Sequence, residues 1–436
     1  MRPKGLSTNN RAISPGPLPA GAPSEPGSES GAELRPSGSG WYGYFVKSPD
    51  SFLERAAWAL LCLLVFSLPM EKGIQFAHLG TISRVLGQAA FLVGAAAVVR
   101  RRNLRKPNAA LPLAAVFVLW GGLSWGWSVA RPETLTRFIT MAQLVGMAWL
   151  IWELCRTGAA QIRLIQAFVA GAAVSSAWTI MRAALNRQTN YRRYATTGFD
   201  PNDLGITLAI ALTFALYLST RVRGLAVWVV RLATVPIVAA ILLTASRAAL
   251  VAALMNFVFV VLAWRHTTVS QRLSSLTLLL LLIAGTVRLA PAATRARLAT
   301  LPNEATEGTL HDRTRIWKAG LRLFKQHPVL GIGLGAYPKA AYPVLRIHYN
   351  AHNTFLSVLV ETGMIGFVLW GLLLATLIWF AGLLAASERA MWFTALAVWG
   401  VAVLTVTWEH RKPTWLIFAL IMTAWARAFQ PEDRTP

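Results

Sequence analysis

A single histidine at the start of a long apolar stretch is the first candidate for chemistry in this sequence. His352 lies in an Asn-Ala-His-Asn-Thr segment at residues 350–354. An imidazole titrates near neutral pH, so His352 could act as a general base, while Asn353 could cap the following helix or bond a sugar hydroxyl. Judged by position alone, a purely structural histidine is the alternative.

Arginines in costly positions are the second candidates. Arg247 ends a Thr-Ala-Ser-Arg turn between two nearly contiguous apolar stretches, where a charge must be paired, face water or reach the membrane interface. Arg192 and Arg193 precede an Asp-Pro-Asn-Asp turn at 200–203 that should cap a helix, and guanidiniums beside a helix N-terminus can bind an anion. The alternatives are a snorkelling Arg247 and a solvated pair of loop arginines.

A predicted amphipathic helix at residues 311–326 carries a third group of cations, among them Arg313 and Arg315. Its apolar stripe should let it lie on the outer surface of a membrane. The stripe comprises Ile316, Trp317, Gly320, Leu321 and Phe324. Asp312 is expected to cap this helix, and the His-Pro pair at 327–328 should end it.

Alternating glycines at 331–335 follow this helix. They lack the preceding strand and the Gly-Lys-Ser/Thr ending of a phosphate-binding loop. We therefore expect them to permit a tight reversal or a close approach of two backbones.

The chain that must position these groups is unusually apolar. Of 436 residues, 55% are hydrophobic and 14% are charged, whereas about a quarter of a soluble domain is charged. Apolar stretches long enough to cross a bilayer predict an all-α polytopic membrane protein with about 12 transmembrane helices. The predicted spans are 55–70, 80–99, 110–128, 136–154, 162–184, 203–219, 225–244, 247–264, 273–290, 353–384, 390–408 and 414–430.

Four regions follow from this pattern. Residues 1–50, rich in Pro, Gly and Ser, are predicted to be a disordered cytoplasmic tail without a signal peptide. Residues 51–290 hold transmembrane helices 1–9, residues 291–351 form a periplasmic loop domain with amphipathic helices, and residues 352–430 hold helices 10–12. Cys62 and Cys155 fall in or near apolar stretches and are expected to be core residues.

The short basic loops orient the chain. The Arg-Arg-Arg-Asn-Leu-Arg-Lys run at 100–106 predicts a cytoplasmic loop, and alternate counting places every candidate residue on the outer face. The segments predicted outside are 186–203, 244–247, 291–351 and 410–413. The net charge is +24, and the longest outer loop holds nine Lys and Arg residues against three acidic ones, contrary to the usual rule. An anionic partner outside would account for this excess.

Several of these segments resemble the motifs of the O-antigen ligase and polymerase superfamily. The resemblance covers roughly residues 190–375, whereas the first five spans match in hydropathy alone. The segments that carry it are Ala-His-Asn-Thr-Phe-Leu at 351–356, Glu-Thr-Gly-Met-Ile-Gly at 361–366, the turn at 244–247, Pro-Asn at 201–202, and the stretches 313–317 and 327–333. It implies a GT-C-like membrane fold and an O-antigen ligase, a glycosyltransferase of the bacterial inner membrane. Such an enzyme moves O-antigen glycan from undecaprenyl pyrophosphate to a lipid A–core sugar in the periplasm.

The resemblance also assigns roles by position. His352 would be the general base on the acceptor hydroxyl and Arg247 an essential pyrophosphate contact. One arginine of each pair would be a further phosphate ligand, and we favour Arg193 over Arg192 and Arg315 over Arg313. A sugar on pyrophosphate carries its own leaving group, so no nucleotide is expected, and displacement by an oxygen nucleophile would invert the anomeric carbon. The outer segments hold no cluster of carboxylates of the kind that a metal would need, so no metal cofactor is expected. The outer acidic residues Asp200, Asp203 and Asp312 are interpreted as helix caps.

Three alternatives stay open. An O-antigen polymerase would use the same donor with another lipid-linked glycan as acceptor. A protein O-oligosaccharyltransferase would transfer to a polypeptide. From another class, a small-anion transporter would suit a basic polytopic protein, but it would place polar groups or broken helices near the middle of the membrane, and the sequence shows few. Membrane lipids are expected partners and nucleic acid is not.

Overall fold

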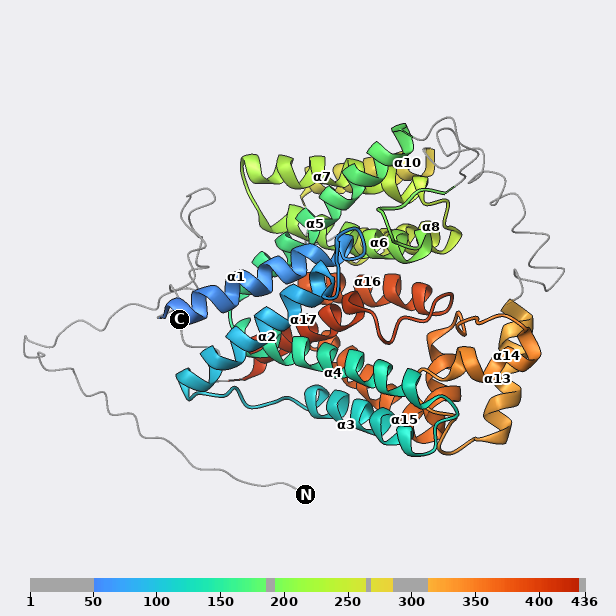
Figure 1. The fold of residues 1–436 in the computed structure, drawn as a ribbon. Coiled ribbons are helices and arrows are strands. Elements are labelled where there is room, and N and C mark those ends of the chain that lie inside the picture. Colours follow the sequence, from blue (N-terminus) through green and yellow to red (C-terminus); the bar gives the residue numbers. More distant parts are fainter. Residues whose placement is uncertain (1–50, 186–192, 264–267, 285–312, 431–436) are drawn as a thin grey trace, which may run out of the picture. The chain divides into compact units, whose positions relative to one another are not determined.

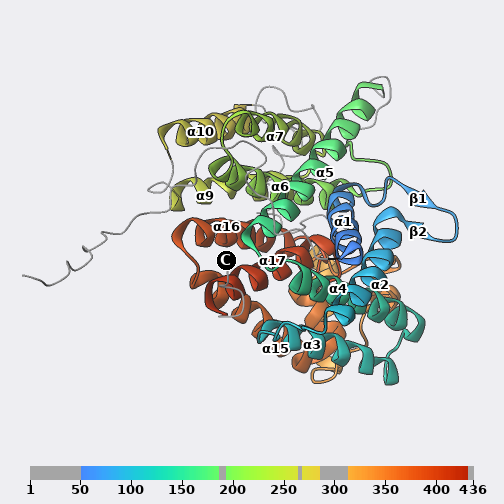
Figure 2. The same ribbon diagram turned by 90° about the vertical axis from the view of Figure 1, so that its left-hand side faces the viewer.

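The computed structural model describes residues 51–185, 193–263, 268–284 and 313–430. These residues form a bundle of α-helices and one two-stranded hairpin (Figures 1 and 2). The predicted tail at 1–50 lies outside the described residues. The helices of the bundle are α1 (Phe52–Ser67), α2 (Ile82–Arg101), α3 (Ala110–Leu123), α4 (Arg131–Leu154), α5 (Gly158–Leu185), α6 (Pro201–Arg221), α7 (Leu225–Leu243), α8 (Arg247–Leu254), α9 (Asn256–Leu262), α10 (Val269–Ala284), α15 (Thr354–Gly382), α16 (Ala386–Val403) and α17 (Lys412–Phe429).

Short elements connect these helices at one end of the bundle. The 3₁₀ turns η2 (Leu68–Met70) and η3 (Ser124–Gly126) follow α1 and α3. The antiparallel strands β1 (Gln75–Phe76) and β2 (Gly80–Thr81) precede α2. Two further helices, α13 (Arg313–Gln326) and α14 (Tyr337–Leu345), precede α15.

The predicted fold class is confirmed, because a helix lies at each predicted span. Seven of the described helices are long and apolar enough to cross a membrane, namely α1 with η2, α2, α4, α5, α6, α7 and α15. The stretch predicted as one span at 247–264 is divided into α8 and α9, with Met255 between them. The total of twelve spans stays a prediction.

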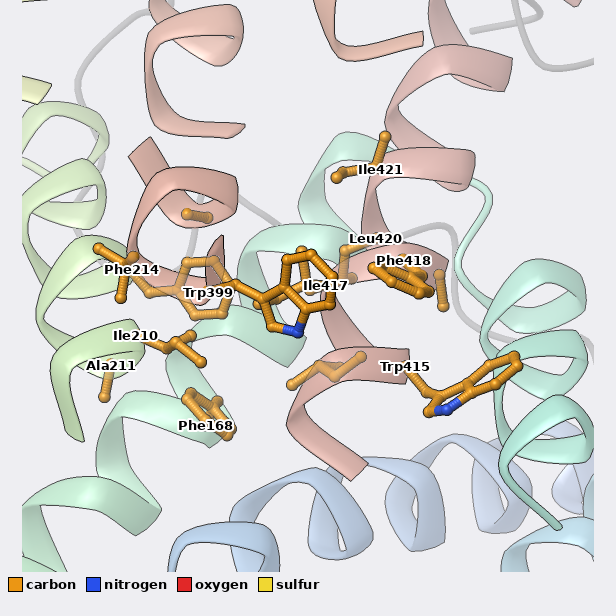
Figure 3. Packing of buried hydrophobic residues seen from close by; sticks show 14 of the residues in the cluster. Phe168, Ile210, Ala211, Phe214, Trp399, Trp415, Ile417, Phe418, Leu420 and Ile421 are labelled. Carbon is orange, nitrogen blue, oxygen red and sulfur yellow. The ribbon is translucent and has the colours of Figure 1, made fainter. Parts of the chain in front are cut away.

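Helix α6 lies at the centre of the bundle. Pro201 occupies its first turn, where a missing N–H costs nothing, and its most apolar window is 94% buried. It packs against α5, α7, α8 and α16. Phe214 of α6 meets Phe168 of α5 edge-on at 5.7 Å and Trp392 of α16 at 6.0 Å. Figure 3 shows the surrounding apolar side chains, including Trp399 and Phe418.

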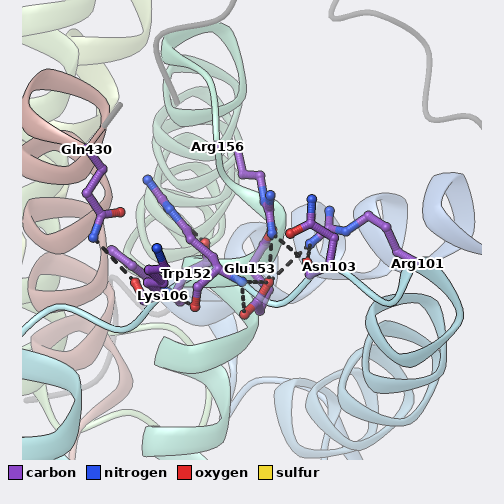
Figure 4. Close-up of polar contacts among 8 residues, drawn as sticks. Arg101, Asn103, Lys106, Trp152, Glu153, Arg156 and Gln430 are labelled. Atoms are coloured by element: carbon purple, nitrogen blue, oxygen red, sulfur yellow. Dashed lines mark hydrogen bonds and ion pairs between the residues drawn. The ribbon is translucent and has the colours of Figure 1, made fainter. Parts of the chain in front are cut away.

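A buried carboxylate closes the end of the bundle where α2 finishes. Glu153, 1% exposed, pairs with Arg101 and Arg156, each at 3.1 Å, and accepts the Arg105 backbone N–H at 3.1 Å (Figure 4). The Arg105 guanidinium lies 3.9 Å from the Trp152 ring centroid. Some of the basic residues at 100–106 are thus bound by protein groups, so not every charge of this run faces water.

Helix α15 is interrupted nine residues after its start. Hydropathy alone predicts a continuous helix, but Gly363 adopts φ 66° and ψ −170°. The glycine-rich loop inserts beside the break: Ile332 and Gly333 donate to the carbonyls of Val360 and Glu361 at 3.1 and 2.9 Å. This close approach of two backbones confirms the role predicted for the alternating glycines.

Helix α13 forms where an amphipathic helix was predicted, and it ends before His327 as expected. Part of its apolar side packs against protein, however. Ile316 and Gly320 are buried against α14 and α15, and the Tyr337 hydroxyl donates to the Ile316 carbonyl at 2.7 Å. Protein therefore covers part of the apolar stripe, and the placement of α13 on the outer surface of a membrane stays a prediction. Of the stripe, Leu321 remains exposed.

Candidate functional site

The first turn of α6 organises the candidate site. Asp200 caps the helix by accepting the backbone N–H of Asn202 at 2.8 Å and of Asp203 at 3.3 Å. This leaves the Asn202 side chain free to reach two other segments. Its oxygen accepts from the Arg193 guanidinium at 2.7 Å and from the Ser246 hydroxyl at 2.9 Å.

The turn that carries Arg247 is fixed by both backbone and side chains. Arg193 donates through Nε to the Thr244 carbonyl at 3.1 Å. Ala245 lies in the left-handed region at φ 49°, and Ser246 caps α8 by accepting the N–H of Ala249. Arg247 is therefore the first residue of a helix whose partially positive N-terminus adds to its own charge. The Arg247 side chain is half-buried. Two of the predicted arginines, Arg193 and Arg247, therefore flank one turn.

His352 lies in the loop directly before α15, in a strained backbone conformation at φ 48°. The Trp317 indole holds the preceding carbonyl, that of Ala351, at 3.1 Å. Asn353 caps α15 by accepting the N–H of Leu356 at 3.0 Å, as its position predicts. The His352 ring is half-buried, lies 6.4 Å from the Tyr349 ring centroid, and makes no hydrogen bond within the described part of the chain.

Burial and charge shift the pKa of His352 downward. Loss of solvent around the ring is the largest cause, and the positive charge of Arg313 adds to it; Asp200 and Asp203 oppose the shift. The imidazole is therefore neutral at neutral pH, the form that can accept a proton. The charges that act on His352 thus belong to the starts of α6 and α13.

A third segment, between α16 and α17, joins α6 to the histidine loop. Trp408 donates its indole N–H to Asp203 at 2.9 Å and its backbone N–H to the Thr354 hydroxyl at 2.8 Å. Arg411 pairs with the other Asp203 oxygen at 2.6 Å. The interpretation of Asp203 as a cap is thus wrong, since Asp200 caps the helix and Asp203 binds side chains.

The predicted site residues do not all contact the same part of the structure. Asn202 joins Arg193 to the turn that precedes Arg247, and Asp203 joins the same end of α6 to the histidine loop through Trp408. The charge of Arg313 lowers the pKa of His352 in this loop. Arg315 instead donates to the Val344 carbonyl at 3.0 Å and is exposed. Arg313 is therefore the member of its pair that acts on His352. Arg192 and Asp312 lie outside the described residues.

Charged residues that the motifs did not single out complete this end of the bundle. Glu409, 1% exposed, lies 3.6 Å from Arg137 and 3.1 Å from His410, and burial raises its pKa while lowering that of His410. Lys412 bonds Glu71 at the end of η2. The feature of the sequence that could have revealed these residues is the Glu-His-Arg-Lys run at 409–412, because four such polar residues rarely interrupt two apolar stretches.

Two further observations concern possible ligands. A small recess beside Asp203 is lined by Leu68, Glu71, Phe199, Asp203, Thr207, Trp408, Arg411 and Pro413. Within the described ranges, no three His, Cys, Asp or Glu side chains gather as a metal site would need.

Both cysteines are free, Cys155 being buried and Cys62 half-buried, as expected for core residues.

This geometry defines a class of protein. It is an all-α polytopic membrane protein with arginines and a neutral histidine at one end of its bundle. Comparison with known proteins makes the class specific: residues 232–371 match the family described as O-antigen ligase. This segment includes Arg247, Arg313, His352 and Asn353. Residues 232–371 therefore belong to the O-antigen ligase superfamily, and the resemblance seen in the sequence is confirmed.

A curated relative agrees with this assignment. The chain is 33% identical over 81 residues to the exopolysaccharide production protein ExoQ of Rhizobium meliloti (strain 1021). The matching stretch covers 16% of this chain and 19% of that relative, so the chain matches only about a fifth of the relative's length.

Proposed function

We propose that this chain is an O-antigen ligase, a glycosyltransferase that acts at the periplasmic face of the bacterial inner membrane. It would move an O-antigen glycan from undecaprenyl pyrophosphate to a sugar of lipid A–core. The observation that carries the proposal is the junction at the first turn of α6. There, Asn202 binds the Arg247 turn through Ser246, and Asp203 binds the histidine loop through Trp408.

The proposed chemistry follows from the charges at this junction. Neutral His352 accepts the proton of the acceptor hydroxyl as its oxygen attacks the anomeric carbon. The bond from that carbon to the pyrophosphate oxygen breaks, the configuration inverts, and Arg247 stabilises the charge that develops on the leaving pyrophosphate. Arg193 and Arg313 add positive charge on either side. A planar guanidinium suits this role, because it can bind two phosphate oxygens at once.

The charge of α13, α14 and their connection supports an anionic substrate. Residues 313–353 contain no Asp or Glu. The exposed cations of this segment are Arg315, Lys318, Arg322, Lys325, Lys339 and Arg346. A surface of one sign raises the local concentration of oppositely charged ligands, which here would be lipid-linked phosphates.

Purified protein in detergent or nanodiscs tests the proposal directly. The assay supplies a defined lipid pyrophosphate-linked glycan with one of two acceptors, either lipid A–core or a second lipid-linked glycan. Transfer to lipid A–core supports a ligase, and the absence of transfer to either acceptor would refute a glycosyltransferase. The same assay in excess EDTA tests metal independence. A loss of transfer that one specific divalent ion restores would contradict that part of the proposal.

A polymerase is the second candidate, because a relative carries the name of an exopolysaccharide production protein. Extension of one lipid-linked glycan by another, without transfer to lipid A–core, would favour it. A deletion strain gives the same distinction in cells: loss of a ligase leaves long lipid-linked polymer, and loss of a polymerase leaves single repeat units.

The interruption of α15 bears on the transporter alternative. A transporter would use a broken helix to offer free backbone groups to its cargo. Here Met364 donates to the Pro328 carbonyl at 2.9 Å, and the Val360 and Glu361 carbonyls accept from the glycine-rich loop. The break is thus filled by protein, which favours an enzyme over a transporter.

A further inference from the structure

Asp203 is too deeply buried to be an ordinary first-turn carboxylate. It is 7% exposed, and a buried carboxylate must be paired and hydrogen-bonded to be tolerated. Oδ2 faces Arg411 at 2.6 Å and Lys72 at 3.8 Å, whereas Oδ1 accepts the Trp408 indole N–H at 2.9 Å. The two cations pair with one oxygen and the indole satisfies the other, so this carboxylate ties α6 to the segment between α16 and α17.

That bond continues toward the histidine loop. The backbone N–H of Trp408 donates to the Thr354 hydroxyl, which in turn donates to the Val406 carbonyl at 2.9 Å. Thr354 is completely buried and begins α15, two residues after His352. Its hydroxyl both donates and accepts, so this point of the histidine loop is fixed in place.

The other side of the same α6 turn holds the arginines. Asn202, adjacent to Asp203, accepts from Arg193 and from Ser246, which directly precedes Arg247. Two consecutive residues of one helix turn therefore hold the two halves of the site. A rigid helix between the groups fixes their separation better than two loops could.

We propose that Asp203 is a positioning residue, which acts through Trp408 and Thr354 to set the distance between the histidine loop and the arginine turn. The inference rests on the proposed glycosyl transfer. A base displaced by about 1 Å can lose about 100-fold in rate without any change in binding. The effect should therefore appear in kcat and not in the KM for the lipid-linked donor.

Variants that cut the link test this role. Trp408→Phe keeps an aromatic ring, although a smaller one, and removes the indole N–H. Thr354→Val keeps the shape but removes the hydroxyl. Each should lower kcat about 10- to 100-fold with an unchanged donor KM. Thr354→Ser retains the hydroxyl, so its kcat should stay close to that of the wild-type protein. Thermal unfolding and gel filtration establish that each variant is folded. If Thr354→Val does not fold, the kcat of Trp408→Phe alone tests the positioning role of Asp203.

Charge and position can be separated by the pH profile. The groups acting on His352 are Arg313, Asp200 and Asp203. Asp200→Asn removes one negative charge but keeps a good cap, so it should move the acid limb of kcat to lower pH without lowering the plateau. Trp408→Phe should lower the plateau and leave the acid limb in place.

A double-mutant cycle completes the test. Asp203→Leu and Trp408→Phe remove the same bond from opposite ends, so the double variant should lose no more kcat than the worse single variant. Folded Trp408→Phe and Thr354→Val proteins with wild-type kcat would overturn the inference while leaving the glycosyltransferase intact. A wild-type protein without transfer would instead refute the proposed function, and the inference with it.

Discussion

The Arg193 guanidinium donates to the side-chain oxygen of Asn202 at 2.7 Å and, from Nε, to the Thr244 carbonyl at 3.1 Å. One planar cation is thus held by acceptors at the start of α6 and the end of α7. It is ordered before a ligand arrives, which removes part of the entropic cost of binding.

Arg193→Lys should weaken donor binding, because an ammonium cannot span both acceptors and still present a donor to phosphate. A charged hydrogen bond contributes about 1.5–3 kcal/mol, so the KM for the lipid-linked donor should rise about 10-fold or more. Steady-state kinetics measure this. Arg131→Lys is the matched control, since that arginine is exposed and lies 5.2 Å from the Trp125 ring centroid. An equal rise in both variants would contradict a specific role for Arg193.

Arg247→Lys should reduce kcat/KM more strongly than Arg193→Lys. The proposed contact is made with the leaving pyrophosphate, so the loss of the planar fork should act mainly on kcat. Single-turnover rates at saturating donor measure the chemical step. An unchanged rate would indicate that Arg247 serves as a point charge or stabilises the fold.

His352→Asn should abolish transfer while preserving the loop. Asparagine tolerates the left-handed backbone conformation at this position but cannot act as a base near neutral pH. His348→Asn is the control, because His348 is exposed and stacks on Tyr342. Substantial transfer by a folded His352→Asn protein would eliminate the proposed base.

The pH profile should report the environment of His352. Because its pKa lies below the usual value, the imidazole stays neutral into mildly acidic solution, and kcat/KM should fall only below the ordinary histidine range. Arg313→Gln removes a charge that lowers this pKa, so the acid limb should move to higher pH. Arg315→Gln should leave the limb in place, because Arg315 is directed toward Val344. Identical shifts in the two variants would show that general surface charge causes the effect.

Gly363→Ala should destabilise the protein by about 2–4 kcal/mol, since it combines a left-handed backbone with a methyl group driven against the Val329 carbonyl. Gly371→Ala in the same helix is the control, because a methyl group there meets no atom within 4 Å. Thermal unfolding in detergent compares the two. Equal melting temperatures would mean that the α15 break can relax.

Much of the scaffold was predictable because hydropathy and caps are local. The helix positions, the cap at Asp200, the end of α13 at Gln326 and the glycine contacts all follow from neighbouring residues. Alternate counting along the spans also grouped Arg193, Arg247 and His352 at one end. Which side of a membrane this end faces stays a prediction.

The rest depends on contacts between distant segments. Asp203 and Trp408 lie 205 positions apart, and nothing near Asp203 distinguishes a cap from a partner of an indole. The amphipathic period of α13 likewise predicts a covered apolar face but not whether lipid or protein covers it. Glu409 was missed because a charged run at a predicted turn is usually solvated, whereas here it is buried against Arg137.

The bond between Lys412 and Glu71 has a consequence for biosynthesis. The two residues are separated by 341 positions, and ribosomes make the chain from its N-terminus. Glu71 therefore emerges long before its partner, and Asp203 likewise waits for Arg411. This end of the molecule can be completed only after Arg411 and Lys412 have been synthesised, so a nascent chain arrested before them lacks a finished site.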